Sequence, residues 1–420
     1  MAHGLRAGKP RKVAGRRGSS TVAGTRAQPA RPTVFVRPQH EGRLLAGHLW
    51  LYRTEIARID GDPRDGDVVF VRAASGKHLG VGWLNLRSAI AVRLLTHDER
   101  EIDEEFLRDR LRGALALRGR LGLEGTASRL VYSEADYLPG LIVDRYADLL
   151  VMQTLTLGMD FRKDLVARLL TELVQPRGIY ARNDPAVRRL EGLPRERGWL
   201  AGGGATEVEI DEAGVSFFVD VAQGQKTGFF LDQRENRTRL ASLARGADVL
   251  DCFAYTGAWS LHAARRGAAS VVGVESSEAA LALAARNAAR NPCGDRCEWV
   301  AENTFDVLRR LAAAGPAFDL VILDPPAFVK SRAALAQGLA GYKEINLRAL
   351  KALRPQGWLI TCSCSYHVDE PTLTRVVWDA ARDARRTIRI VESRSQARDH
   401  PVHPAMPETR YLKCLVIAVE

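Results

Sequence analysis

The segment DVLDCFAYTG, at residues 248–257, decides the fold class of the second half of the chain. It is an apolar run with an acidic residue, Asp251, near its end, and it continues into a tight turn that closes on Gly257. Two other apolar runs end in the same way, FDLVILDPPAF at residues 318–328 and GWLITCSCS at residues 357–365. In a parallel α/β sheet the carboxyl ends of such strands converge on one crevice. We therefore predict that a turn, a carboxylate and a thiol meet there.

The whole chain has 420 residues, which is too long for one ordinary core. In residues 221–420 strands and helices alternate, which is typical of a doubly wound, Rossmann-like sheet. Residues 106–220 mix strands with an amphipathic helix, which predicts a middle α+β domain. Residues 33–105 hold short β-type runs between turn clusters, which predicts a small antiparallel barrel. The expected fold class is α/β, with the barrel and the α+β domain ahead of the Rossmann-like domain.

The composition is that of a soluble globular protein, with 46% apolar and 26% charged residues. No apolar stretch approaches the roughly 20 residues that a membrane span needs, so we expect a cytoplasmic protein with no membrane partner. The six cysteines lack the framework of a small secreted protein and are expected to be reduced. Cys293 and Cys297 have no second pair at ligand spacing, so no metal is expected.

Residues 1–32 form a basic tail that accounts for eight of the eleven net positive charges. The tail contains no acidic residue and is rich in Gly, Ala, Ser and Pro, which predicts disorder. One interpretation is a solubilising extension, and the one that we favour is a weak, non-specific attraction to phosphates. An Arg-rich organelle presequence stays open.

An acidic residue, Glu275, ends the next predicted strand, SVVGVESS at residues 270–277. A carboxylate there is placed to accept both hydroxyls of a ribose, although such residues are as often surface caps. The turn before it lacks the closely spaced glycines that let pyrophosphate approach a helix N-terminus. It therefore favours a nucleoside cofactor without phosphates, of which S-adenosylmethionine is the common one. The turn residues that we expect at this cofactor are Asp251, Phe253, Tyr255, Thr256 and Gly257.

Asn303 follows the third predicted strand, within CEWVAENTF at residues 297–305. Its amide is placed to bind the adenine edge of the cofactor. Capping of the following helix is an equally good interpretation.

The motif DPPAF, residues 324–328, gives the strongest local signal. Two successive prolines force an extended backbone and remove two amide donors, so carbonyls and the Asp324 carboxylate face the crevice. Fixed acceptors of this kind can hold the exocyclic amino group of a nucleic-acid base, although a plain turn has the same sequence. Downstream, Tyr342 and Lys343 supply an aromatic ring and a positive charge. A base-binding rim and a solvated face both look like this.

Cys364 lies just beyond the predicted strand, beside the expected methyl donor and Asp324, whereas Cys362 lies within the strand and is expected to be a packing residue. A thiolate that adds to carbon-6 of cytosine makes carbon-5 nucleophilic enough to attack a methyl sulfonium. Asp324, protonated or as a hydrogen-bond relay, would stabilise that adduct. A free thiol has a pKa of about 8.5, so the site must lower it or a neighbour must take the proton. The target base must leave its stack to reach the thiol.

Six motifs together resemble the bacterial large-subunit ribosomal RNA methyltransferase I family, which makes 5-methylcytosine. They are GQKTGFFLDQRENR (224–237), DCFAYTG (251–257), DPPAF (324–328), GYKEIN (341–346), TCSCS (361–365) and DHPVHPAMPETRYLK (399–413). The resemblance runs from about residue 34 to the C-terminus. It implies an RNA-binding PUA domain at the N-terminus, a middle domain marked by YARNDPAVRRLEG (180–192), and a C-terminal class I methyltransferase domain.

The resemblance also implies roles for individual residues. Cys364 is similar to the family's nucleophile and Asp324 to its catalytic-loop acid. Glu275 resembles the ribose-binding carboxylate, and Asn303 stands where the family often has Asp near adenine. Many RNA 5-methylcytosine enzymes have a second cysteine at the position of Pro326. This family has proline there, so product release must use another base.

The segment around Asp232 implies contacts to the methionine end of the cofactor or to RNA, whereas its spacing alone indicates a charged loop. We assign Gln233 to the cofactor, and Asp324 to the cofactor as well as to catalysis. The residues assigned to RNA are Lys226, Arg234, Pro325, Pro326, Phe328, Tyr342 and Lys343.

The implied partner is large-subunit ribosomal RNA, naked or in a precursor particle, and a homodimer stays open. Two other classes of function are kept. A related enzyme would methylate a guanine or an exocyclic amine without a cysteine nucleophile. A non-catalytic RNA-binding factor would retain the fold without cofactor affinity.

Overall fold

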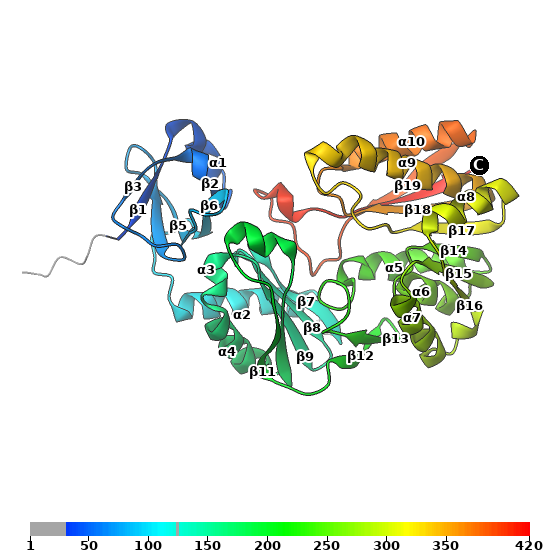
Figure 1. Cartoon of the computed structure of the whole chain (residues 1–420), viewed down its shortest axis with the longest axis horizontal. Helices are drawn as coiled ribbons and strands as arrows, with labels where there is room; N and C mark the ends of the chain where they lie inside the picture. Colours follow the sequence, from blue (N-terminus) through cyan, green and yellow to red (C-terminus); the bar gives the residue numbers. More distant parts are fainter. Residues whose placement is uncertain (1–30, 123–125) are drawn as a thin grey trace, which may run out of the picture. The chain divides into compact units, whose positions relative to one another are not determined.

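The first sheet of the computed structural model, which describes residues 31–122 and 126–420, contains six short strands (Figure 1). These are β1 (Thr33–Val36), β2 (Trp50–Tyr52), β3 (Ile56–Asp60), β4 (Val68–Arg72), β5 (His78–Leu84) and β6 (Ile90–Thr96), with the short helix α1 (Glu41–Leu45) between β1 and β2. The strand order is β2-β6-β5-β4-β1-β3. The pair β1 and β4 is parallel, so the prediction of a purely antiparallel barrel is wrong in this detail. Parallel neighbours need a crossover connection, which the intervening elements supply.

The second sheet contains five strands in the order β11-β10-β9-β8-β7. The elements of this part are α2 (Glu104–Arg120), β7 (Ala127–Tyr132), β8 (Leu141–Tyr146), β9 (Leu149–Thr154), α3 (Leu157–Asp160), α4 (Lys163–Val174), β10 (Gly178–Asn183) and β11 (Glu196–Gly202). Helix α4 is the predicted amphipathic helix, and it buries Val166, Leu169 and Leu170 against the sheet. A hairpin follows, β12 (Glu207–Glu212) and β13 (Val215–Asp220). Its buried residues pack against both Leu149 of β9 and Leu261 of the next part of the chain.

The third sheet has seven strands in the order β16-β15-β14-β17-β18-β20-β19. Its strands are β14 (Asp248–Cys252), β15 (Ser270–Glu275), β16 (Cys297–Ala301), β17 (Phe318–Leu323), β18 (Leu353–Ser363), β19 (Ile388–Arg394) and β20 (Lys413–Val419). Its helices are α5 (Arg234–Leu240), α6 (Ala258–Arg265), α7 (Glu278–Arg290), α8 (Thr304–Ala314), α9 (Leu335–Ala352) and α10 (Glu370–Ala384). Strands β14 to β18 are parallel, and β20 is antiparallel to both of its neighbours. The predicted α/β architecture is confirmed.

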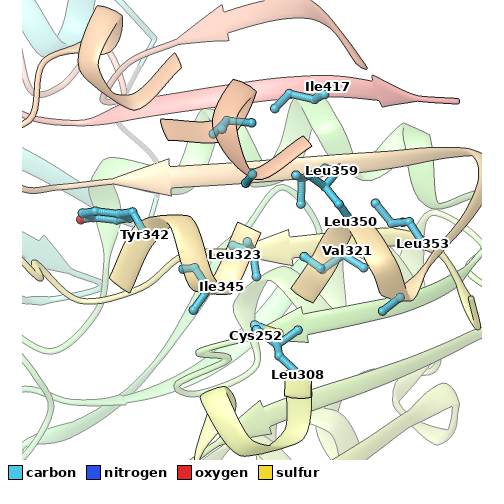
Figure 2. Packing of buried hydrophobic residues seen from close by; sticks show 14 of the residues in the cluster. Cys252, Leu308, Val321, Leu323, Tyr342, Ile345, Leu350, Leu353, Leu359 and Ile417 are labelled. Atoms are coloured by element: carbon cyan, nitrogen blue, oxygen red, sulfur yellow. The ribbon is translucent and has the colours of Figure 1, made fainter. Parts of the chain in front are cut away.

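Helices cover both faces of this sheet, with α5, α6 and α7 on one face and α8, α9 and α10 on the other (Figure 1). Figure 2 shows part of the core, in which Leu323 and Leu359 of the sheet lie close to Ile345 and Leu350 of α9. The chain leaves β14 toward β15 and β16 and then returns to β17 on the other side of β14. This reversal makes a topological switch point beside β14, which is where α/β sheets bind ligands.

The three sheets lie inside the predicted segments 33–105, 106–220 and 221–420, whose boundaries remain a proposal. The predicted tail, residues 1–32, lies almost entirely outside the described residues. Among the helices of residues 31–122 and 126–420, none combines the length and the apolar character of a membrane span. All six cysteines are free, and the described residues contain no cluster of His, Cys, Asp and Glu suited to a metal ion.

Candidate active site

A cavity of about 830 Å³ lies at the carboxyl ends of the parallel strands. Its volume is in the range of small-molecule and cofactor sites. The wall combines the residues that follow β14, β15, β17 and β18 with the loop before α5 and with parts of β10 and β11. The wall residues that the sequence predicted are Lys226, Gln233, Phe253, Tyr255, Glu275, Asp324, Pro325, Pro326 and Cys364. The structure thus brings most of the predicted chemistry to one place.

The turn after β14 has a strained backbone. Phe253 and Tyr255 have φ angles of +66° and +50°, which cost a residue other than glycine about 1–2 kcal/mol each. The hydroxyl of Tyr255 accepts a hydrogen bond from Gln225 N at 2.8 Å and donates one to Gly228 O at 3.2 Å. The amide of Tyr255 donates to Glu275 Oε2 at 3.1 Å. These bonds hold the turn against the neighbouring loop and strand, and strain of this kind is concentrated at ligand sites.

Three residues of the predicted cofactor turn lie behind the cavity wall. Asp251 is fully buried and accepts hydrogen bonds from Ser260 N at 3.0 Å and Ser260 Oγ at 2.6 Å. Burial raises the pKa of Asp251 to about 7. Gly257 has a φ angle of +81°, and a Cβ atom there would lie 2.4 Å from the Trp299 ring, so only glycine fits. Thr256 is buried as well. These residues shape the turn, and their contact with the cofactor stays a prediction.

Asn303 also lies outside the cavity wall. It is the N-cap of α8, and its Oδ1 accepts a hydrogen bond from Phe305 N at 2.9 Å. The sequence left two interpretations open, and this bond is the helix cap that one of them predicted. The contact with adenine stays a prediction.

Asp324 is held by two neutral donors. Its Oδ1 accepts a hydrogen bond from Gln233 Nε2 at 3.0 Å, and its Oδ2 accepts one from Trp259 Nε1 at 3.1 Å. Burial raises the pKa of Asp324, and the charge of Asp232 raises it further. A carboxyl group in this setting is suited to hold a proton or to share one with a bound base.

Cys364 follows the last residue of β18, and its thiol contacts the backbone of the DPPAF motif, with Sγ 3.9 Å from Pro325 O. Burial raises the pKa of this thiol, and the positive charges of Lys226 and Lys413 oppose the increase. Cys362 is fully buried in β18 opposite Cys414 of β20, as expected of a packing residue. Cys364 therefore differs from Cys362 in facing a cavity.

Asp232, in the loop before α5, places one free oxygen in the wall. Its Oδ2 accepts from Tyr411 OH at 2.5 Å and from Lys226 Nζ at 3.0 Å. Burial opposes ionisation, but the charges of Lys226 and His400 and the hydrogen bonds from Tyr411 and Lys226 together outweigh it and hold the pKa of Asp232 well below its usual range. Within the described residues its buried Oδ1 has no hydrogen-bond partner. A buried carboxylate oxygen of this kind fits a cationic donor such as the amino group of a bound ligand.

The structure corrects the assignment of Tyr342 to RNA. This residue is fully buried and lies among apolar side chains of the core (Figure 2). Its hydroxyl is 2.9 Å from both Ser363 Oγ and Ser365 Oγ. The spacing of Tyr342, Ile345 and Ala349 on one face of α9 is the signal that could have shown this. Tyr342 therefore fixes the chain on both sides of Cys364 and is not on an RNA-binding rim.

Three other residues assigned to RNA also have partners within the protein. Arg234 donates to Ala127 O at 2.8 Å and to Asp399 Oδ2 at 3.0 Å, so it joins the second and third parts of the chain. Lys343 pairs with Asp383 of α10 at 2.7 Å. The ring of Phe328 packs against the rings of Phe253, Phe305 and Tyr342. None of these three lines the cavity, so within the protein they have structural contacts, and their contact with RNA stays a prediction.

Sequence reasoning missed the contribution of the middle domain to the wall. Arg182, at the end of β10, donates to Val221 O at 2.7 Å and to Gly224 O at 2.9 Å. It thereby holds the loop that leads to Lys226. Arg197 of β11 lines the same wall and pairs with Asp184 at 2.7 Å. No local sequence pattern links these arginines to the other wall residues, of which Asp324 and Cys364 lie more than 100 positions away.

Comparison with known proteins adds two family matches. A model of S-adenosylmethionine-dependent methyltransferases matches residues 192–417, and a model of PUA-like domains matches residues 34–97. The chain is 41% identical to ribosomal RNA large subunit methyltransferase I of Aeromonas hydrophila over 391 residues, which is 92% of this chain and 98% of that protein. It is 40% identical to the protein of the same name from Alteromonas mediterranea, with 92% and 98% covered.

Solved structures with a similar fold include a candidate S-adenosylmethionine-dependent methyltransferase from Streptococcus mutans. The two chains have a TM-score of 0.78 and 21% identity, with 92% of this chain and 99% of that one covered. A second methyltransferase structure, complexed with S-adenosylhomocysteine, has a TM-score of 0.79 and 20% identity, with the same coverage. These similarities show that the fold extends over nearly the whole chain.

Proposed function

The chain belongs to the ribosomal RNA large subunit methyltransferase I family of S-adenosylmethionine-dependent enzymes, and on that premise we propose that it methylates carbon-5 of a cytosine through a covalent adduct at Cys364. The observation that carries the proposal is the shared wall of one cavity. That wall combines Cys364, Asp324 and Glu275, which are a thiol, a carboxyl group of raised pKa and a carboxylate at a strand end. They supply a nucleophile, an acid and a ribose ligand for the reaction.

The wall residues fit S-adenosylmethionine, which supplies a methyl group on a sulfonium. Glu275 at the end of β15 would hold the ribose hydroxyls. The unpaired Oδ1 of Asp232 would accept from the α-ammonium group of the methionine part. Phe253 and Tyr255 line the same wall, where their rings offer apolar surface to the adenosine part.

The protein side of the reaction follows from Cys364 and Asp324. The thiolate of Cys364 adds to carbon-6 of the cytosine, which makes carbon-5 nucleophilic and places negative charge on the ring nitrogen. Asp324, whose pKa burial raises, donates a hydrogen bond or a proton to that nitrogen. After carbon-5 has gained the methyl group, it loses its proton, and the bond between sulfur and carbon-6 breaks. The base that takes this proton stays unassigned, because the position of a second cysteine is occupied by Pro326.

The RNA substrate has to deliver one unstacked base into the cavity. The presence of a PUA-like domain supports the proposal that the rest of the RNA binds outside the cavity. Lys226, Pro325 and Pro326 on the wall are the proposed base and phosphate contacts. The two prolines lack amide donors, so this segment offers carbonyl acceptors, of which Pro325 O already contacts Cys364 Sγ.

The proposal is tested by mapping methylated nucleosides in ribosomal RNA from cells with and without this protein. Loss of one 5-methylcytosine from large-subunit RNA in the deleted strain, and its return when purified protein acts on that RNA, is the expected result. Loss of a methylated guanine or amine instead would support the alternative without a cysteine nucleophile. An unchanged nucleoside profile would contradict both.

Replacing Glu275 by alanine is expected to weaken binding of S-adenosylmethionine by about 10- to 100-fold, because two hydrogen bonds from ribose to a charged group are lost. Isothermal calorimetry with the full chain measures this directly. The matched control is Glu278→Ala, because Glu278 is exposed in the first turn of α7 and outside the cavity wall. Equal affinity of the two variants would exclude Glu275 as the ribose ligand.

A further inference from the structure

Lys413 is a buried lysine beside the proposed nucleophile. It is the first residue of β20, only 6% of its surface is exposed, and its Cα is paired with that of Ser363 across the antiparallel pair β18 and β20. Ser363 directly precedes Cys364. No step proposed above uses Lys413.

The ammonium group of Lys413 has only neutral partners. Its Nζ donates to Ser365 O and to Tyr411 O, both at 2.7 Å. None of the ion pairs within residues 31–122 and 126–420 involves Lys413, and the charge of Asp369 acts on it only from beyond ion-pair distance. Burying a charge without a counter-ion is costly, so a nearby negative charge that forms during the reaction would be stabilised there.

The contact with Ser365 also fixes the chain around Cys364. Ser365 follows the nucleophile, and its carbonyl accepts the bond from Lys413. Its hydroxyl oxygen accepts from Val329 N at 3.1 Å and lies 2.9 Å from Tyr342 OH. These three contacts, from Lys413, Val329 and Tyr342, hold the turn, and of the three only the one from Lys413 carries a charge.

Four charged groups act on the thiol of Cys364. Burial raises its pKa most, and Asp324 and Asp232 raise it further, whereas Lys226 and Lys413 lower it. Lys226 is largely exposed and already pairs with Asp232 at 3.0 Å. Lys413 is the buried cation of the two.

The charge state of Lys413 responds in turn to its surroundings. Burial lowers the pKa of Lys413 to about 8, Arg410 lowers it as well, and Cys364 and Asp369 raise it. A nearby thiolate stabilises the charged form of such a lysine, and the charged lysine in turn stabilises the thiolate.

We propose that Lys413 is a positioning residue that holds the turn after Cys364 and stabilises the Cys364 thiolate by its positive charge. Its use in catalysis rests on the covalent mechanism proposed above. Its effect on the thiol does not, because ionisation of Cys364 can be measured without any RNA.

The experiment measures the rate of alkylation of Cys364 by iodoacetamide against pH in the full-length protein, with the Cys364 peptide followed by mass spectrometry. In Lys413→Met the apparent pKa of the thiol is expected to rise by about one unit, which slows alkylation at pH 7 about tenfold. Lys413→Arg keeps the charge and is expected to retain most of the rate. Calorimetry with S-adenosylmethionine reports whether each variant is folded.

The matched control is Tyr342→Phe, which removes the uncharged contact with the same turn. It is expected to leave the pH profile of alkylation in place. An equal shift in Tyr342→Phe and Lys413→Met would show that Lys413 acts only through the backbone, and an unchanged profile in Lys413→Met would overturn the proposal. If Cys364→Ala still methylates RNA, the covalent mechanism fails, whereas the alkylation profile still decides the effect of Lys413 on the thiol.

Discussion

Cys364→Ala is expected to lower methyl transfer by on the order of 10⁴-fold or more, the size of effect that loss of a catalytic nucleophile causes, while binding of S-adenosylmethionine persists. The thiol lies on the cavity wall 3.9 Å from Pro325 O, and the change removes the sulfur atom together with this weak contact. Transfer of a labelled methyl group to ribosomal RNA measures the first effect. Calorimetry measures the second.

A matched control for this substitution is Cys293→Ala, because Cys293 is half-buried and outside the cavity wall. It is expected to retain activity. RNA with 5-fluorocytidine at the target should form a stable adduct with the wild type and with Cys293→Ala but not with Cys364→Ala. Methylation that persists in Cys364→Ala would contradict the covalent mechanism and would favour methylation of a guanine or an exocyclic amine.

The sequence predicted the part of the cavity wall at the strand ends because parallel strands that are buried on both faces have near-continuous apolar runs. The burial patterns of β14 and β17 are of this kind, with a single half-buried residue in each. Where such a run stops, the next polar residue has to lie at the carboxyl edge of the sheet. This local rule was enough to bring Glu275, Asp324 and Cys364 together.

Side chains on helices were harder to predict, because their direction depends on the phase of the helix and on partners far away in the sequence. Tyr342 and Lys343 are adjacent, yet one is fully buried and the other pairs with α10. The resemblance implies an RNA contact for Arg234, and the sequence does not show its partner within the protein, Asp399, which is 165 positions away. Lys413 and Arg182 meet the site only through the folded chain, so no spacing in the sequence points to them.

Asp324→Asn is expected to lower kcat by about 10²- to 10⁴-fold, the contribution typical of a general acid. Asparagine cannot hold a proton for the ring nitrogen of the base, although it keeps the size of the side chain. It also cannot accept from both Gln233 Nε2 and Trp259 Nε1, which now donate to the two carboxyl oxygens. One of these donors loses its partner, which costs about 1–3 kcal/mol of folding free energy.

Two measurements separate the loss of activity in Asp324→Asn from its loss of stability. They are the stability and kcat of a second variant and the pH profile of kcat. Trp259→Phe removes one donor from Asp324 but leaves the carboxyl group, so it is expected to lower stability in thermal unfolding with a much smaller effect on kcat. Because burial raises the pKa of Asp324, its protonated form is present below the folded pKa and is lost as pH rises through it. The wild-type pH profile of kcat should therefore contain an alkaline decline that Asp324→Asn lacks. A wild-type profile without that decline, together with equal kcat for the two variants, would exclude Asp324 as the acid and leave it the structural role of fixing the turn before the two prolines.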